Sequence, residues 1–171
     1  YLFDMIFAQA YADVNRRLIA DTLCEALRVK LKDEVVSVHN FIDFSDGMIR
    51  KGAIRSYEGE RMIIPFNMRD GVLICEGKSN AEWNFSAPHG AGRVMSRGKA
   101  FQNLDVDKFR SQMSGVFSTS VGERTLDEAP DAYKKAGFIE AAIAPTATIV
   151  DRLIPIHNLK SLGKQRKKKQ R

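Results

Sequence analysis

Apolar residues recur at helical spacing from residue 1 to about residue 30, in a stretch without glycine or proline. This pattern predicts one amphipathic helix, or two in series, whose apolar stripe packs into the core. The stripe consists of Leu2, Met5, Ile6, Tyr11, Val14, Leu18, Ile19, Leu23 and Leu27.

Three later stretches, residues 35–42, 61–65 and 72–75, are β-branched and apolar and are typical of buried strands. Turns are predicted at Asp46-Gly47 and Glu58-Gly59. From Val94 onward the composition favours a helix. The chain is therefore predicted to be α+β, with mainly antiparallel strands layered with helices.

Length and composition indicate one globular domain, because the chain has 171 residues, 44% hydrophobic and 28% charged. The formal net charge is +6, but residues 164–171 alone carry six positive charges, so residues 1–163 are neutral. We therefore expect a folded unit over residues 1–163 and a solvated basic tail over 164–171 that attracts RNA diffusely.

Cys24 and Cys75 lack CxxC spacing, and we expect free thiols in a reducing compartment. No apolar run is long enough to span a membrane and no leader pattern is present, so a cytoplasmic location without membrane association is predicted. Tyr1 opens directly into helical periodicity, so we expect the chain to be part of a longer protein.

The most informative stretch is residues 84–97, Asn-Phe-Ser-Ala-Pro-His-Gly-Ala-Gly-Arg-Val-Met-Ser-Arg. Gly90 and Gly92 can adopt positive φ and turn their amides toward an anion, which a following helix N-terminus would favour. Arg93 and Arg97 would share one face of that helix. His89 could then attack a phosphorus atom. The alternative is a tight turn with a structural histidine and two solvated arginines.

This stretch, read as His-Gly-Ala-Gly-Arg-x-Met-Ser-Arg, resembles the signature of the RtcB family of RNA ligases. Further blocks agree with that family: Asn15-Arg16 in the first helix, Arg-Lys-Gly-Ala at 50–53, and Asp-Glu-Ala-Pro-x-x-Tyr-Lys at 127–134. The resemblance covers nearly all of residues 1–163 and corresponds to roughly the C-terminal half of such a ligase. It implies that His89 attacks the α-phosphate of GTP and carries GMP as a phosphoramidate.

His39 and Asn40 lie in the stretch predicted as a strand. A lone histidine there is more often a hydrogen-bonded core residue than a ligand. The family, however, has a His-Asn pair in a similar place, and its histidine is one ligand of a two-Mn²⁺ centre. The resemblance therefore implies that His39 binds Mn²⁺, with Asn40 beside it.

The resemblance also implies a nucleotide site. The residues that it assigns to this site are His39, Asn40, Pro65, Asn67, Met68, Gly90, Ala91, Gly92, Arg93, Tyr133 and Lys160. The sequence departs from the family where it has Phe66 and Asn67 in place of Gly-Ser and Val72 in place of a serine. Since Val72 offers no side-chain hydrogen bond, guanine specificity stays open.

The basic block at 50–55 either lines the phosphate side of the site or protects an exposed strand edge.

The activity implied by the resemblance is RNA ligation, in tRNA splicing or RNA repair. A 2′,3′-cyclic phosphate or 3′-phosphate end is joined to a 5′-hydroxyl end, with GTP and Mn²⁺ as cofactors and RNA as the partner. The family's other metal ligands belong to upstream motifs that this chain lacks. The rival interpretation is a non-catalytic RNA- or nucleotide-binding remnant. His157 matches no family role, and we interpret it as structural.

Overall fold

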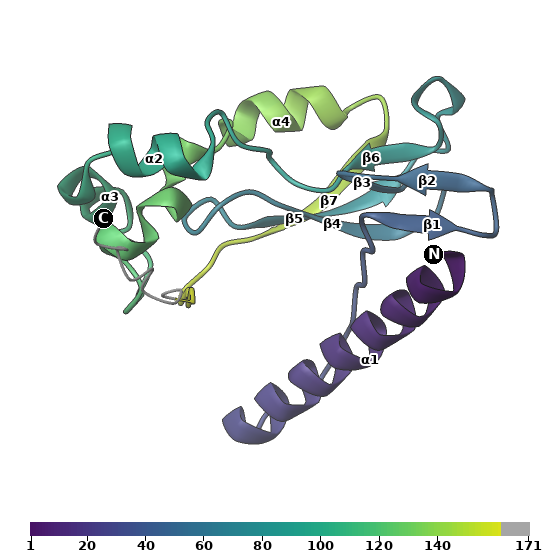
Figure 1. Cartoon of the computed structure of the whole chain (residues 1–171), viewed down its shortest axis with the longest axis horizontal. Coiled ribbons are helices and arrows are strands. Elements are labelled where there is room, and N and C mark those ends of the chain that lie inside the picture. The colour runs from purple at the N-terminus through teal and green to yellow at the C-terminus, as the bar shows by residue number, and fades with distance from the viewer. Residues whose placement is uncertain (162–171) are drawn as a thin grey trace, which may run out of the picture.

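The computed structural model describes residues 1–161, in which a long helix precedes three small antiparallel sheets and a helical end (Figure 1). The helices of this part are α1 (Leu2–Leu27), α2 (Arg97–Asn103), α3 (Val106–Gln112) and α4 (Ala136–Ile143). Short 3₁₀ segments cover Ala81–Trp83, Glu123–Glu128 and Pro130–Ala132. The α+β class predicted from the sequence is confirmed.

Every strand pairing is antiparallel in the sheets of this part of the chain. β1 (Phe41–Asp43) pairs with β2 (Met48–Arg50), and β3 (Ala53–Arg55) pairs with β6 (Ser86–Pro88). β4 (Arg61–Pro65), β5 (Val72–Gly77) and β7 (Ala147–Leu153) form the three-stranded sheet, with β5 in the middle. Of the predicted strands, 61–65 and 72–75 are confirmed.

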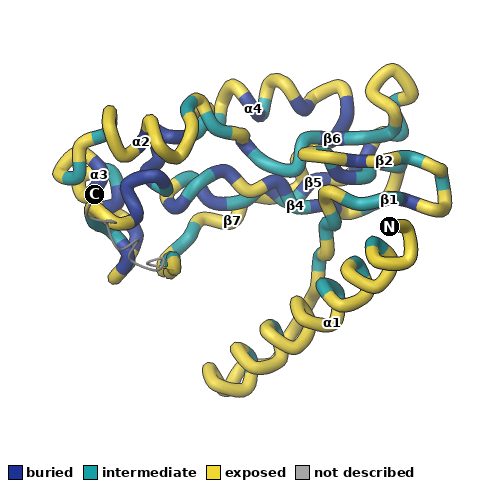
Figure 2. The backbone as a smooth tube through the Cα atoms, in the orientation of Figure 1, coloured by how far each residue is buried: buried dark blue, intermediate teal, exposed yellow. Residues whose placement is uncertain are grey.

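The main core lies between the three-stranded sheet and α4. Ile64, Leu73 and Cys75 from β4 and β5 meet Ile139 and Ile143 of α4, and all five side chains are buried. Figure 2 shows these strands as the buried centre of the molecule. A second core, built around Met68 and Phe109, holds the helical end together.

Helix α1 forms as predicted, but its expected packing into the core is wrong for residues 1–161. None of its residues is buried, and in Figure 2 it extends as an exposed rod from β1. Its large apolar side chains lie on more than one face of the helix, and Phe3 and Phe7 are 87% and 73% exposed. The helix meets the sheets through the Gln9 side chain, which exchanges two hydrogen bonds with the backbone of Ile42.

The buried strand predicted over residues 35–42 is also wrong, because only Phe41 and Ile42 belong to a strand. Asn40 adopts a left-handed φ of 55°, which breaks the extended run before β1. The segment before Asn40 contacts β4 through a side chain and not through strand pairing. The Oγ of Ser37 accepts a hydrogen bond from the Ile63 amide at 2.8 Å. His39 is consequently exposed.

Cys24 and Cys75 are free thiols, as expected. Within residues 1–161, no helix is both long and apolar enough to cross a membrane. The predicted basic tail, 164–171, lies outside the described residues.

Candidate active site

The central histidine is positioned by a strand pairing. β3 and β6 align Ala53 with Pro88, which brings the next residue, His89, beside Gly52. The His89 amide approaches the Gly52 carbonyl oxygen at 3.4 Å. Gly52 has a φ of +69°, and a Cβ on it would lie 3.6 Å from Cε1 and Nδ1 of the imidazole. Gly52 therefore lies against one side of the His89 imidazole.

His39 covers another side of the same imidazole. The two rings stack with centroids 4.8 Å apart and an interplanar angle of 16°. The neighbouring Asn40 accepts a hydrogen bond from the Gly52 amide at 2.7 Å, so one glycine holds both segments. The two histidines that the sequence singled out thus come together.

Although His39 is exposed overall, its pKa is lowered, first by partial desolvation of the ring and then by Coulombic repulsion from His89 and Arg16. A lowered pKa favours the neutral imidazole, which is the form that binds a metal ion. Arg16 belongs to α1, so the family-like Asn-Arg pair of that helix reaches the vicinity of the site.

The glycine-rich loop is held by backbone contacts on both sides. The Ala91 amide donates to the Pro65 carbonyl oxygen at 3.0 Å, and the Gly92 carbonyl accepts from the Lys134 amide at 3.1 Å. Only Gly92, with a φ of +69°, uses the positive φ that the sequence suggested for both loop glycines. Gly90 is needed for space, because a Cβ there would approach the Pro65 oxygen at 3.0 Å.

The helix expected from Val94 begins later, at Arg97. Ser96 caps it by accepting a hydrogen bond from the Lys99 amide, while the Val94 amide bonds to Ala132. The loop amides therefore do not lie at a helix N-terminus, and Arg93 and Arg97 do not share a helical face. Instead, both arginines converge on the same acidic pair, Asp127 and Glu128.

Glu128 is the centre of this charged network. It accepts from Arg93 at 3.1 Å and from the Tyr133 hydroxyl at 2.9 Å, and Nζ of Lys160 lies 3.2 Å away. Arg93 also lies over the Tyr133 ring, with Cζ 4.7 Å from the centroid. Burial opposes ionisation of Glu128, but the Tyr133 hydrogen bond and the charges of Lys160 and Arg93 outweigh it, so its pKa lies below the usual value.

Four residues assigned to the nucleotide site, Pro65, Asn67, Tyr133 and Lys160, line one cavity of about 280 Å³. The Asn67 side chain already forms hydrogen bonds within its own turn. Its Oδ1 accepts from the Arg69 and Asp70 amides, and its Nδ2 donates to the Asp70 carboxylate. Met68 lies in the second core instead, 1% exposed. His157 contacts the Phe117 ring, away from the two histidines.

Sequence reasoning missed Gly52 and Glu128. Glu128 is visible in the Asp-Glu-Ala-Pro block, but only the fold brings three basic side chains around it. Gly52 stood inside the Arg-Lys-Gly-Ala block. The β3–β6 pairing that gives it a role is not visible in any local pattern.

Comparison with known proteins gives a consistent result. The family model described as tRNA-splicing ligase RtcB matches residues 1–161. The chain is similar to the RNA-splicing ligase RtcB of Escherichia coli K12, with 30% identity over 168 residues that cover 88% of this chain and 40% of that protein. It is also similar to the tRNA-splicing ligase RtcB of Nanoarchaeum equitans, with 28% identity covering 78% of this chain and 36% of that protein. The chain spans about 40% of the length of these relatives.

Proposed function

Because the chain belongs to the RtcB family, as its motifs predict, we propose that the complete protein containing it is an RNA ligase. It joins a 2′,3′-cyclic phosphate or 3′-phosphate end of RNA to a 5′-hydroxyl end, through GMP carried on His89. The relatives are named as RNA-splicing or tRNA-splicing ligases, and the chain aligns with about 40% of their length.

The observation that carries the proposal is the placement of His89. Its imidazole stands at the head of the glycine-rich loop, with the Gly52 backbone on one side and the His39 ring on another. In the proposed step, a neutral imidazole nitrogen attacks the α-phosphorus of GTP, an N–P bond forms, and the bond to the leaving pyrophosphate breaks. Transfer of GMP to the RNA 3′-phosphate and displacement by the 5′-hydroxyl would then regenerate His89.

The residues around Glu128 fit a nucleotide. Nη1 of Arg93 is buried and has no hydrogen-bond partner within residues 1–161, so an arginine beside the loop retains an unused donor suited to a phosphate oxygen. Tyr133 and Lys160 line the adjacent cavity. We assign GTP to this region, with the triphosphate toward the loop.

His39 fits one position of a manganese site, because its ring is exposed at the protein surface and its lowered pKa favours the neutral ligand form. Residues 1–161 contain no group of three or more histidine, cysteine or acidic side chains arranged to hold a metal ion. The remaining ligands would therefore come from outside residues 1–161. When bound, Mn²⁺ would neutralise negative charge on the phosphates.

An RNA-joining assay on the complete protein tests this proposal. Two oligoribonucleotides, one ending in a 2′,3′-cyclic phosphate and one beginning with a 5′-hydroxyl, are incubated with GTP and Mn²⁺. We expect joining by the wild type and by His157→Ala, and none by His89→Gln. Joining by His89→Gln at the wild-type rate would refute the role of His89.

The rival function, a non-catalytic RNA- or nucleotide-binding remnant, is favoured by one observation, the incomplete metal ligand set of residues 1–161. It predicts nucleotide binding without joining by the complete protein. The same assay separates the two functions, provided that GTP binding is measured alongside it.

A further inference from the structure

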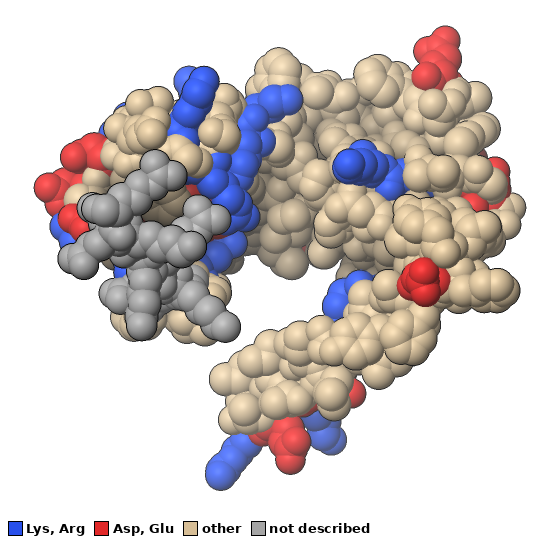
Figure 3. All heavy atoms as spheres, in the orientation of Figure 1, with Lys and Arg blue, Asp and Glu red and all other residues tan. Residues whose placement is uncertain are grey.

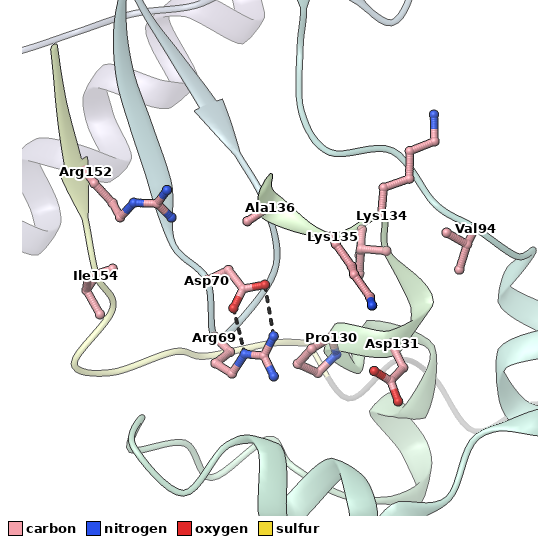
Figure 4. A pocket seen from close by; sticks show the side chains of 11 residues that line it. Arg69, Asp70, Val94, Pro130, Asp131, Lys134, Lys135, Ala136, Arg152 and Ile154 are labelled. Carbon is pink, nitrogen blue, oxygen red and sulfur yellow. Dashed lines mark hydrogen bonds and ion pairs between the residues drawn. The ribbon is translucent and has the colours of Figure 1, made fainter. Parts of the chain in front are cut away.

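A second and larger cavity, of about 730 Å³, shares Tyr133 with the cavity that Pro65 and Lys160 line. Its walls come from the turn between β4 and β5, from the segment that leads into α4, and from β7 (Figure 4). Lys135 and Arg152 point into it from opposite walls, while Lys134 extends along its rim. Nothing in the proposed guanylylation of His89 uses this space.

Basic side chains dominate the charge of this cavity. Arg69, Lys134, Lys135 and Arg152 line it, against only two carboxylates, Asp70 and Asp131. Both carboxylates are already neutralised, Asp70 by Arg69 at 2.6 Å and Asp131 by Lys108 at 2.8 Å. Arg152 pairs with Glu140 outside the cavity.

The two lysines are different, because neither has a carboxylate partner within residues 1–161, and both side chains are exposed. Figure 3 shows that Lys and Arg side chains gather on this face, beside the hollow between the helical end and the sheets. The cavity therefore offers two positive charges that no carboxylate of residues 1–161 compensates.

The cavity borders the glycine-rich loop that follows His89. The Lys134 amide donates to the Gly92 carbonyl oxygen at 3.1 Å, and a Cβ on Gly92 would touch Cε of the Lys134 side chain at 4.0 Å. Tyr133 lines both cavities.

We propose that this cavity holds the backbone of the RNA strand being joined, with Lys134 and Lys135 contacting its phosphates; this rests on the proposed ligase function. A single RNA strand combines regularly spaced negative charge with flat apolar bases. The cavity offers both complements, since Val94 and Ile154 line it and are 56% and 61% exposed. A compact anion would need only the charges, whereas a polynucleotide uses the apolar wall as well.

The test measures RNA affinity of the complete protein as a function of salt. Lys134→Ala/Lys135→Ala is compared with Lys30→Ala/Lys32→Ala, which removes the same charge from exposed positions outside the cavity. At low salt we expect the cavity variant to bind a single-stranded oligoribonucleotide about tenfold more weakly, and the slope of log K against log salt to become shallower by about 1.4. The control pair should match the wild type, and Lys134→Arg/Lys135→Arg should retain wild-type affinity because it retains the charge.

Three results would overturn the inference. The first is equal weakening of RNA binding by Lys134→Ala/Lys135→Ala and by the control pair. The second is RNA binding by Lys134→Arg/Lys135→Arg that is as weak as that of the alanine variant. The third is an alanine variant that binds RNA normally but needs a higher GTP concentration for labelling. The last result would assign the cavity to the triphosphate. Labelling of the wild type with GTP is measured in parallel, since its absence refutes the proposed function even where the RNA result is as expected.

Discussion

The imidazole of His89 stacks on that of His39, with ring centroids 4.8 Å apart, although His39 precedes β1, His89 follows β6, and the two share no secondary-structure element. Gly52 makes this possible, because its carbonyl oxygen lies near the His89 amide and its own amide donates to Asn40. A residue proposed to bind a metal and a residue proposed to attack phosphorus are thus fixed relative to each other by one glycine.

His39→Ala should lower the number of Mn²⁺ ions bound per molecule of complete protein, because it removes an imidazole ligand without disturbing any buried contact. Equilibrium dialysis followed by elemental analysis measures the stoichiometry. His157→Ala serves as the matched control, since that histidine contacts only the Phe117 ring among aromatic side chains of residues 1–161. An unchanged Mn²⁺ content in His39→Ala would return His39 to a structural role.

Arg93→Lys should raise the GTP concentration needed for half-maximal labelling by roughly tenfold. A lysine ammonium cannot stack on Tyr133, pair with Glu128 and still offer a second forked donor, as the guanidinium does. Labelling is measured over a range of GTP concentrations. Arg110 is exposed and, within residues 1–161, forms its ion pair with Asp107 alone, so Arg110→Lys is the control and should label as the wild type does. Equal half-saturation in the two variants would contradict a phosphate role for Arg93.

Glu128→Gln should make the free energy of unfolding less dependent on pH in the acidic range. The folded-state pKa of Glu128 is below its unfolded value of 4.5, so its contribution is fully present above that value and is lost as pH falls through the folded pKa. At pH 7 the variant should be about 2 kcal/mol less stable than the wild type, and the difference should vanish in strong acid.

Urea unfolding of the complete protein between pH 7 and pH 3 measures this difference. Glu123→Gln provides the comparison, because Glu123 is exposed and makes no ion pair with the described residues. If the two variants show the same pH profile, the charged network around Glu128 does not stabilise the fold.

Gly71→Ala should destabilise the protein by roughly 3 kcal/mol, because Gly71 has a φ of +80° and a Cβ there would collide with the Leu153 carbonyl oxygen. Gly98→Ala should instead raise the free energy of unfolding by about 0.5–1 kcal/mol, because Gly98 lies in α2 with open space around it. Thermal unfolding compares the two. Equal effects would mean that the β5–β7 approach at Gly71 is not tightly packed.

Local patterns predicted the elements whose causes are local. The helix of residues 2–27, the strand 61–65, most of the strand 72–77 (predicted over 72–75) and the turn at Asp46-Gly47 follow from periodicity and turn chemistry in their own residues. The motifs around His39, His89 and Tyr133 likewise identified the family, because they are contiguous blocks.

Features that depend on distant partners were not predictable in this way. Val94 has a composition around it that favours a helix, but its amide donates to the Ala132 carbonyl oxygen. The helix therefore begins only after the Ser96 cap, at Arg97. The strand expected over 35–42 fails at Asn40, whose positive φ is tied to a hydrogen bond with Gly52. The exposure of α1 was unpredictable for the same reason. Periodicity identifies a helix, but it does not identify the surface against which the helix packs.

The central claim is that His89 carries GMP, and the most direct measurement is covalent labelling. The complete protein is incubated with α-labelled GTP and Mn²⁺, denatured, and examined for bound label in the wild type, His89→Ala, His89→Gln and His157→Ala. We predict that the wild type and His157→Ala retain label that is released by acid, as a P–N bond requires, and that both His89 variants retain none. Persistent labelling of both His89 variants would contradict the account.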